Sequence, residues 1–263
     1  MKGKLLMLLL CTLLIAAAQA QSSKQRDYYQ ITVYHFKDTM QENIIDDYLE
    51  HALVPTLHSM NIKTVGVFKA LDNDTATDKR MYVLMPVHSL NDIAGIADKL
   101  TSQIANSTAL LNGGTRYLTA PYDTAPYTRM ENILLEAFPM ATQMQLPQLK
   151  SPHKDRVYEL RSYEGATEKL HASKIKMFNT GNEVGIFKNL NFNAVFYAEV
   201  LSGSRMPNLM YMTTFENMAD REAHWKQFND SPDFKKLLAT SEYQHNVSKA
   251  DIIFLRPTDY SDI

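Results

Sequence analysis

Cysteine is nearly absent from this chain of 263 residues, which holds Cys11 and no second one. A single cysteine cannot form an internal disulfide, and this one lies in an apolar N-terminal segment that we expect to be removed. The processed chain should therefore carry no disulfide, no thiol nucleophile and no thiolate metal site. Its stability would have to come from its core.

The sequence also lacks an excess of charge and the common phosphate and hydrolase motifs. The formal net charge is −2, and no long run of Lys or Arg occurs, so a basic surface for nucleic acid is not expected. There is no G-x-S-x-G, no G-x-x-x-x-G-K-[ST] and no G-x-G-x-x-G. The composition, 45% hydrophobic and 21% charged, is that of an ordinary globular protein.

The N-terminal segment is the one long apolar run. Two lysines precede nearly continuous Leu, Ile and Ala from Leu5 to Ala18, and Ala18 and Ala20 form a small-x-small cleavage pattern. These features predict a signal peptide over residues 1–20, and hence an exported protein, periplasmic or extracellular, with no stable membrane span after processing. An uncleaved anchor and a lipidated Cys11 are the alternatives, and the cleavage pattern favours neither.

The rest of the chain shows one order of elements twice. Alternating apolar residues and helical periodicity predict the first set, with Thr39 as a helix cap. The first set comprises a strand over 28–36, a helix over 45–60, strands over 64–71 and 81–87, a helix over 93–104, and extended segments over 116–122 and 129–138. The second set comprises a strand over 156–163, a helix over 166–179, strands over 193–201 and 209–215, helices over 218–229 and 234–240, and a strand over 251–255.

Short motifs support a duplication. Residues 29–34 (YQITVY) align with residues 158–163 (YELRSY), and residues 81–84 (MYVL) align with residues 210–213 (MYMT). Each set spells β-α-β-β-α-β, the ferredoxin-like arrangement. We expect domains over 24–142 and 155–263, joined by a Pro-containing linker over 143–154. The alternative is that any two α+β domains look alike at this level.

Such units have a physical reason to pair. A four-stranded sheet with both helices on one face leaves its other face bare, and soluble proteins rarely expose a large apolar face. Two sheets can cover each other, so we expect an α+β fold in which two tandem ferredoxin-like units pack face to face, as in a dimeric α/β barrel. The space between the sheets is then the natural ligand pocket.

The second half resembles the NIPSNAP family of the dimeric α/β-barrel superfamily. The resemblance covers roughly residues 155–257 and is carried by residues 158–163 (YELRSY), residues 209–221 (LMYMTTFENMADR) and Trp225. Residues 231–234 (SPDF) depart from the family pattern, and the first half lacks the Glu-Leu-Arg core of the strand motif. The resemblance implies the fold, and it implies binding or signalling roles. Superfamily relatives include cofactor-free monooxygenases and haem-degrading enzymes, activities that do not transfer by fold alone.

The strand over 156–163 supplies the main candidate site. A period of two places Glu159, Arg161 and Tyr163 on one face. If this face looks into the space between the sheets, a charged pair would lie in a partly apolar cavity, as ligand sites often have. A structural salt bridge or a solvated edge is the alternative.

Tyr211 and His224 complete the set of candidate ligand-binding residues. His224 precedes Trp225, a pair of residue types that haem-degrading relatives use, but Trp225 falls at core spacing with its helix neighbours and no partner Asn is identified. Glu168 and His171 have the i, i+3 spacing of a carboxylate-bridged metal unit, which alone favours an ordinary surface pair. We therefore expect no metal and no cofactor.

Three functions are compatible with these patterns. The first is an exported protein that binds a small, mostly apolar ligand between the sheets, with weak catalysis or none. The second is a cofactor-free monooxygenase acting on an aromatic substrate, with Tyr or His as base. The third is a structural or partner-binding module with a filled barrel. A homo-oligomer is compatible with all three.

Overall fold

The computed structural model describes residues 25–105 and 114–263. The expected signal peptide over residues 1–20, with Cys11, lies outside this range. Within the range, no helix has both the length and the apolar character that crossing a bilayer requires.

The first half contains four strands and its own set of helices, in the order expected from the sequence. Its elements are β1 (Tyr28–Phe36), α2 (Thr39–Tyr48), a π-helical turn (Leu49–Leu53), α3 (Val54–Ser59), β2 (Gly66–Ala70), β3 (Lys79–Val87), α4 (Leu90–Ala105), α5 (Gly114–Leu118) and β4 (Arg129–Ala137). Residues 143–154, the expected linker, follow β4 and include the start of a short 3-10 helix (His153–Asp155).

The second half repeats the order of strands and helices. Its elements are β5 (Val157–Glu164), α6 (Glu168–Phe178), α7 (Glu183–Asn189), β6 (Phe196–Ser202), β7 (Asn208–Phe215), α8 (Met218–Asp230), α9 (Pro232–Leu238), a 3-10 turn (Ser241–Tyr243) and β8 (Lys249–Pro257).

The eight strands form one closed antiparallel barrel. Its order is β1-β3-β2-β8-β5-β7-β6-β4, so each half contributes four adjacent strands in the same relative order. The halves join where β2 pairs with β8 and where β4 pairs with β6. The two expected sheets thus cover each other's bare faces, and they do so as one continuous barrel without free edges.

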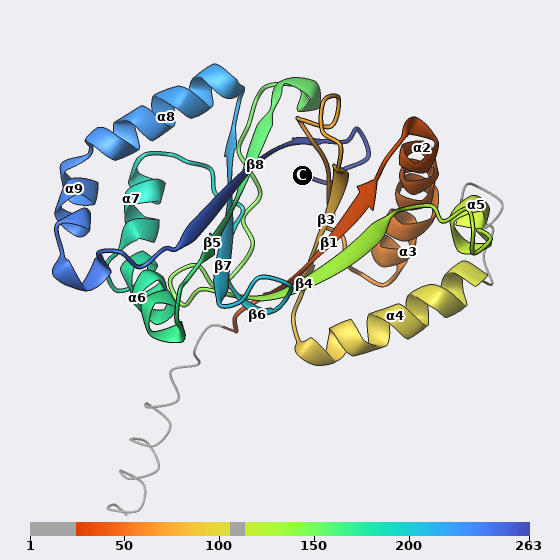
Figure 1. Cartoon of the computed structure of the whole chain (residues 1–263), viewed down its shortest axis with the longest axis horizontal. Coiled ribbons are helices and arrows are strands. Elements are labelled where there is room, and N and C mark those ends of the chain that lie inside the picture. The colour runs from red at the N-terminus through yellow and green to blue at the C-terminus, as the bar shows by residue number, and fades with distance from the viewer. Residues whose placement is uncertain (1–24, 106–113) are drawn as a thin grey trace, which may run out of the picture.

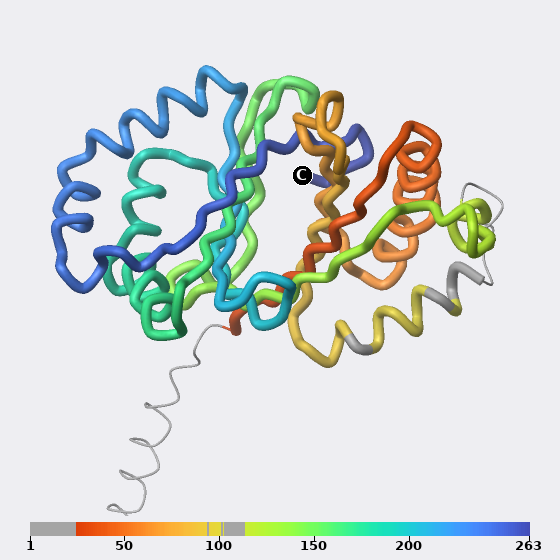
Figure 2. The backbone as a smooth tube through the Cα atoms, viewed as in Figure 1, coloured from red at the N-terminus to blue at the C-terminus, as the bar shows by residue number. Residues whose placement is uncertain are grey.

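Helices lie outside the barrel in two groups. In Figure 1, α2 to α5 flank the strands of the first half and α6 to α9 flank those of the second. The tube in Figure 2 shows β8 crossing from the second half toward the first, where the chain ends. The carboxylate of Asp262 accepts a hydrogen bond from the backbone N–H of Val65 at 2.7 Å, which fastens the C-terminus to the first half.

Side chains from both halves fill the barrel interior. The Tyr29 ring packs on Phe196 with centroids 5.1 Å apart, and the Phe68 ring packs on Tyr158 at 4.9 Å. These four side chains are buried. Aromatic rings from the two halves thus meet inside the barrel.

Three local predictions need correction. Residues 116–122, expected to be extended, begin within α5 (Gly114–Leu118). The cap of α2 is Asp38, whose side chain accepts a hydrogen bond from the backbone N–H of Gln41, where Thr39 was expected. The helix expected over 45–60 contains the π-helical turn between α2 and α3, and α3 begins with Pro55 in its first turn, where a missing N–H is tolerated.

Candidate functional site

Strand β5 is buried on both faces, and its two faces meet different layers. Tyr158 and Leu160 point into the barrel core. Glu159 and Arg161 point the other way, toward α8, where Glu159 is fully buried. The expectation that Glu159, Arg161 and Tyr163 look into the space between the sheets is therefore wrong. The two-residue alternation of a strand grouped these three residues correctly, but it does not indicate which of two buried faces points into the barrel.

Glu159 is the centre of a buried ion network. One carboxylate oxygen accepts hydrogen bonds from Arg221 Nε and from Trp225 Nε1, both at 2.8 Å. The other accepts from Arg161 Nε and, at 3.2 Å, from Arg221 Nη2. A buried carboxylate is stable only when charged donors satisfy it, and four hydrogen bonds do so here.

Arg161 leads from this network into a chain of hydroxyl groups. Its guanidinium lies 3.6 Å from the centre of the Trp225 ring, and its Nη1 donates to the Tyr163 hydroxyl at 2.9 Å. The Tyr163 and Tyr211 hydroxyl groups are 2.9 Å apart. Because Tyr163 accepts from an arginine that can only donate, its own proton is free to go to Tyr211. The proton of Tyr211 is then left to donate elsewhere.

The protonation states of Arg161 and Tyr211 are set by their surroundings. Burial lowers the pKa of Arg161, but Tyr211, Tyr163 and Glu159 together raise that pKa by more, so the guanidinium stays charged. Burial, and then the neighbouring Tyr163, raises the pKa of Tyr211 well above its ordinary value. The Tyr211 phenol therefore stays protonated and acts as a donor at any physiological pH.

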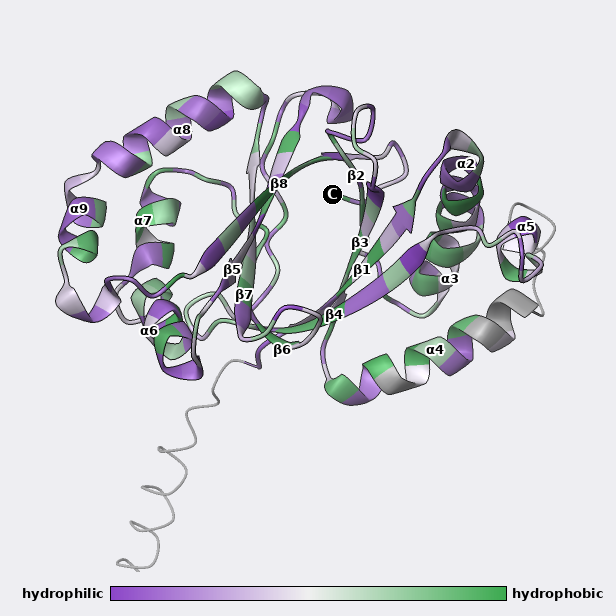
Figure 3. Cartoon of the chain, in the orientation of Figure 1, coloured by the Kyte–Doolittle hydropathy of each residue, from purple (hydrophilic) through white to green (hydrophobic). Residues whose placement is uncertain are grey.

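A cavity of about 280 Å³ lies between this face of the sheet and the helices of the second half. We call it the α8 cavity; Arg161, Tyr163, Tyr211 and Trp225 line it. Figure 3 shows α8 as mostly hydrophilic, and of its thirteen residues only Trp225 and Phe228 are buried. Helix α8 thus covers the polar face of the sheet with two aromatic side chains and the Arg221 guanidinium.

A second ion pair closes the other side of the α8 cavity. Lys174 of α6 donates to Glu183 of α7 at 2.9 Å, and both residues are buried. The Lys174 ammonium also lies 4.7 Å from the centre of the Phe178 ring. The cavity lining thus carries three cations (Arg161, Lys174 and Arg221) and one carboxylate, with Glu159 beneath them.

His224, Glu168 and His171 do not line the α8 cavity. The His224 ring packs on Phe192 and Phe215, and its Nδ1 lies 2.9 Å from the backbone oxygen of Asp220. His171 faces Glu199 at 3.3 Å, not Glu168. No group of three or more metal-ligating side chains occurs among the residues that the structure describes.

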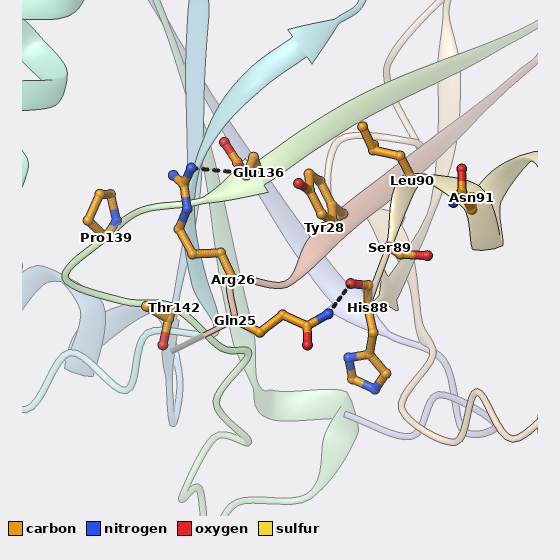
Figure 4. Close-up of a pocket in the computed structure, with 10 residues that line it drawn as sticks. All are labelled: Gln25, Arg26, Tyr28, His88, Ser89, Leu90, Asn91, Glu136, Pro139 and Thr142. Carbon is orange, nitrogen blue, oxygen red and sulfur yellow. Dashed lines mark hydrogen bonds and ion pairs between the residues drawn. The ribbon is translucent and has the colours of Figure 1, made fainter. Parts of the chain in front are cut away.

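A larger hollow, of about 860 Å³, is lined by residues of the first half, near the start of α4 (Figure 4). There Arg26 pairs with Glu136 at 2.7 Å, and Gln25 donates to the backbone oxygen of His88 at 2.8 Å (Figure 4). Since these polar groups bind one another and His88 is exposed, the hollow lacks the buried, convergent donors of the α8 cavity.

Sequence reasoning missed the contributions of Lys174, Glu183 and Arg221. They come from three helices and converge only in the fold. One signal was available for Arg221, because it lies four residues before Trp225 and so on the same helix face. For Glu183 there was none, since α7 is short and starts after Asn182, which has a positive φ of 67°.

The fold and this cavity define an eight-stranded α/β barrel with helices outside. Residues 158–262, within the second half of the chain, match the NIPSNAP family model. No curated protein matches the chain.

Two solved structures resemble nearly the whole chain. A proposed monooxygenase from Lactobacillus acidophilus is 12% identical, with a TM-score of 0.52, over 88% of this chain and 94% of that one. A proposed monooxygenase from Fusobacterium nucleatum is 6% identical, with a TM-score of 0.51, over 89% and 93%. A NIPSNAP-like domain protein from Burkholderia xenovorans is 14% identical, with a TM-score of 0.37, over 41% and 90%. At their low identities, the likeness to the two whole-chain structures shows the fold alone.

Proposed function

We propose that this protein binds a small organic molecule in the α8 cavity. The proposal is based on two hydrogen-bond donors in this cavity that have no acceptor among the described residues. The Tyr211 proton has no acceptor in the hydroxyl chain, and Arg161 Nη2 makes no hydrogen bond to a described residue. Unused donors on a charged arginine and a buried phenol call for an acceptor from a ligand.

The lining defines the chemical class of this ligand. Aromatic rings of Tyr163, Tyr211 and Trp225 favour a flat, apolar body. Three cations against two carboxylates leave one positive charge in excess, which favours a single negative group. A compact aromatic carboxylate or phenolate satisfies both conditions, and a volume of about 280 Å³ limits it to about one ring.

The α8 cavity favours binding over oxygenase chemistry. Cofactor-free oxygenation of an aromatic substrate needs a base that removes a proton. Both carboxylates here are held by cations, Glu159 by two arginines and Glu183 by Lys174. The phenol of Tyr211 has a raised pKa, and His224 lies elsewhere. The described lining therefore offers donors but no unpaired base.

The proposal includes export and a common origin of the two halves. Cleavage after Ala20 would leave Gln21 as the first residue, and the repeated strand order supports a duplicated unit. Export is tested by N-terminal sequencing of protein recovered outside the cytoplasm. A chain that starts at Met1 and stays with the cells would contradict it.

The fluorescence of Trp225, the one tryptophan of the chain, reports directly on the α8 cavity. Titration with benzoate should change the emission and saturate. Arg161→Gln should weaken binding tenfold or more, because one charge-assisted hydrogen bond contributes about 1.5–3 kcal/mol. Tyr211→Phe should weaken it less.

Two controls sharpen this titration. Arg116→Gln alters an exposed arginine outside the cavity and should leave benzoate binding unchanged. Benzyl alcohol has the same ring without the charge and should bind more weakly than benzoate. Equal affinity for the two compounds, or an emission that does not respond to benzoate, would contradict the proposed ligand class.

A further inference from the structure

A separate cluster of polar side chains lies at one mouth of the barrel, where β1 ends and β3, β4 and β7 begin. A cavity of about 110 Å³ opens there, and it shares no lining residue with the α8 cavity. Its apolar floor includes Val33, Ile133, Met210 and Ile253, from four strands of both halves. The volume has room for roughly four water molecules at about 30 Å³ each.

His35 lies at the centre of this mouth and is only 6% exposed. Its Nδ1 lies 2.8 Å from a carboxylate oxygen of Asp78, which can only accept, so Nδ1 carries a proton and donates it. Its Nε2 faces Arg129 Nη2 at 3.3 Å and Glu131 Oε1 at 3.4 Å. The ring is therefore held in one orientation by side chains from strand β4 and from the loop before β3.

The strand register surrounds His35 with arginine. Arg80 of β3 and Arg129 of β4 lie directly opposite His35 on its two neighbouring strands. Arg205 also lines the mouth, but its guanidinium pairs with the carboxylate of Asp251. The other two guanidinium groups of the lining, on Arg80 and Arg129, equal in number the carboxylates on Asp78 and Glu131.

Arg80 shows that this cluster is incomplete within the described chain. Its Nε is buried and makes no hydrogen bond to a described residue. Its nearest carboxylate, on Asp72, is 3.7 Å from Nη2, which is beyond hydrogen-bond distance. A buried donor on a charged group is costly when unsatisfied, and an acceptor in the adjacent cavity removes that cost.

We propose that the barrel mouth is a second binding site, for a small aliphatic monocarboxylate. The carboxylate accepts from Arg80 beside His35, and a short alkyl tail lies on the floor formed by Val33, Ile133 and Met210. Acetate to butyrate fits the volume. The unsatisfied donor of Arg80 and the apolar floor favour a monocarboxylate over phosphate, which is more highly charged and has no apolar part.

Isothermal titration calorimetry with butyrate at neutral pH tests this site in the protein without residues 1–20. We expect saturable 1:1 binding, weakened tenfold or more by Arg80→Gln, with Arg116→Gln as the control that leaves it unchanged. If Arg80→Gln does not fold, as judged by circular dichroism, Arg129→Gln, whose side chain is 60% exposed, carries the same expectation. Phosphate should not compete with butyrate.

Cross-variants separate this site from the α8 cavity. Arg161→Gln should keep its affinity for butyrate, and Arg80→Gln should keep the response of Trp225 to benzoate. Absence of butyrate binding by the unaltered protein would overturn the mouth site. Equal competition by phosphate, unchanged butyrate affinity in Arg80→Gln, or loss of that affinity in Arg161→Gln would overturn it as well.

Discussion

The two halves share a strand order but fill the space between strand and helices differently. Tyr34 on β1 and Tyr163 on β5 end the matching segments of the two halves. Tyr34 packs against Tyr117 and Tyr127, with ring centroids 6.2 and 6.0 Å away, and is buried among tyrosines. Tyr163 joins a chain of charged and hydroxyl groups beside a cavity.

The same contrast holds at the preceding residues on the same face of each strand. Gln30 and Thr32 of β1 bind the exposed Asn132 through neutral hydrogen bonds of 3.2 and 2.7 Å. Their counterparts in the aligned segments, Glu159 and Arg161, form an ion pair beneath Trp225. At these matched positions, the first half thus has neutral rings and amides, whereas the second half has charged groups beside a cavity. A shared fold therefore does not imply a shared site.

The largest expected effect comes from removing the charge of Glu159. Glu159→Gln keeps the shape but leaves Arg161 and Arg221 without a carboxylate, which should lower the free energy of unfolding by about 3–5 kcal/mol. Urea unfolding followed by circular dichroism measures it. Glu164→Gln, on the same strand but in a looser pair with Lys249 at 3.8 Å, should cost less than about 1 kcal/mol. Equal losses in the two variants would contradict a special role for Glu159.

A smaller effect is expected from the tyrosines of the first half at high pH. Burial, and then Tyr127, raises the pKa of Tyr48 to about 12, whereas in the unfolded chain the phenol ionises near pH 10. Between these values the unfolded state binds fewer protons, so the free energy of unfolding falls as pH rises, by about 1.4 kcal/mol per pH unit for this group.

Urea unfolding at several pH values from about 9 to about 12, a range that includes both pKa values, measures this fall in the free energy of unfolding. Tyr48→Phe should reduce its slope, whereas Tyr122→Phe, at a residue that is 99% exposed, should not. An identical slope in Tyr48→Phe and the unaltered protein would be the contrary result.

The smallest expected effect comes from moving the charged pair into the first half. Gln30→Glu with Thr32→Arg reproduces the pattern of β5 on β1, where the partners are half-exposed and Trp225 has no counterpart above them. Exposed pairs contribute about 0–1 kcal/mol, so the double variant should change the free energy of unfolding by less than about 1 kcal/mol. A gain of several kcal/mol would show that the strand residues alone, without α8, make the network.

Much of the fold was predictable because it depends on local patterns. Apolar alternation located β1 at Tyr28–Phe36 and placed most other strands within a few residues. Helix α5 was missed because Gly114–Leu118 is too short to show a period, and α7 was missed for the same reason.

The candidate site was half predictable. Alternation groups Glu159, Arg161 and Tyr163 on one face of β5. The sequence identifies the inner face of a strand only when one face is polar and the other apolar, and β5 has two buried faces. Lys174 and Glu183 meet these residues only through the packing of α6 and α7. The mouth around His35 depends on the register of β1 with β3 and β4, which no local pattern specifies.

The central claim is that ligand binds outside the barrel, beneath α8, and this is tested most directly by crystallography with 4-bromobenzoate. The account predicts an anomalous bromine peak in the cavity lined by Arg161, Tyr211 and Trp225, lost in crystals of Arg161→Gln. A peak in the space enclosed by the strands, between Tyr29 and Tyr158, would contradict it, as would a saturated crystal with no peak in the cavity.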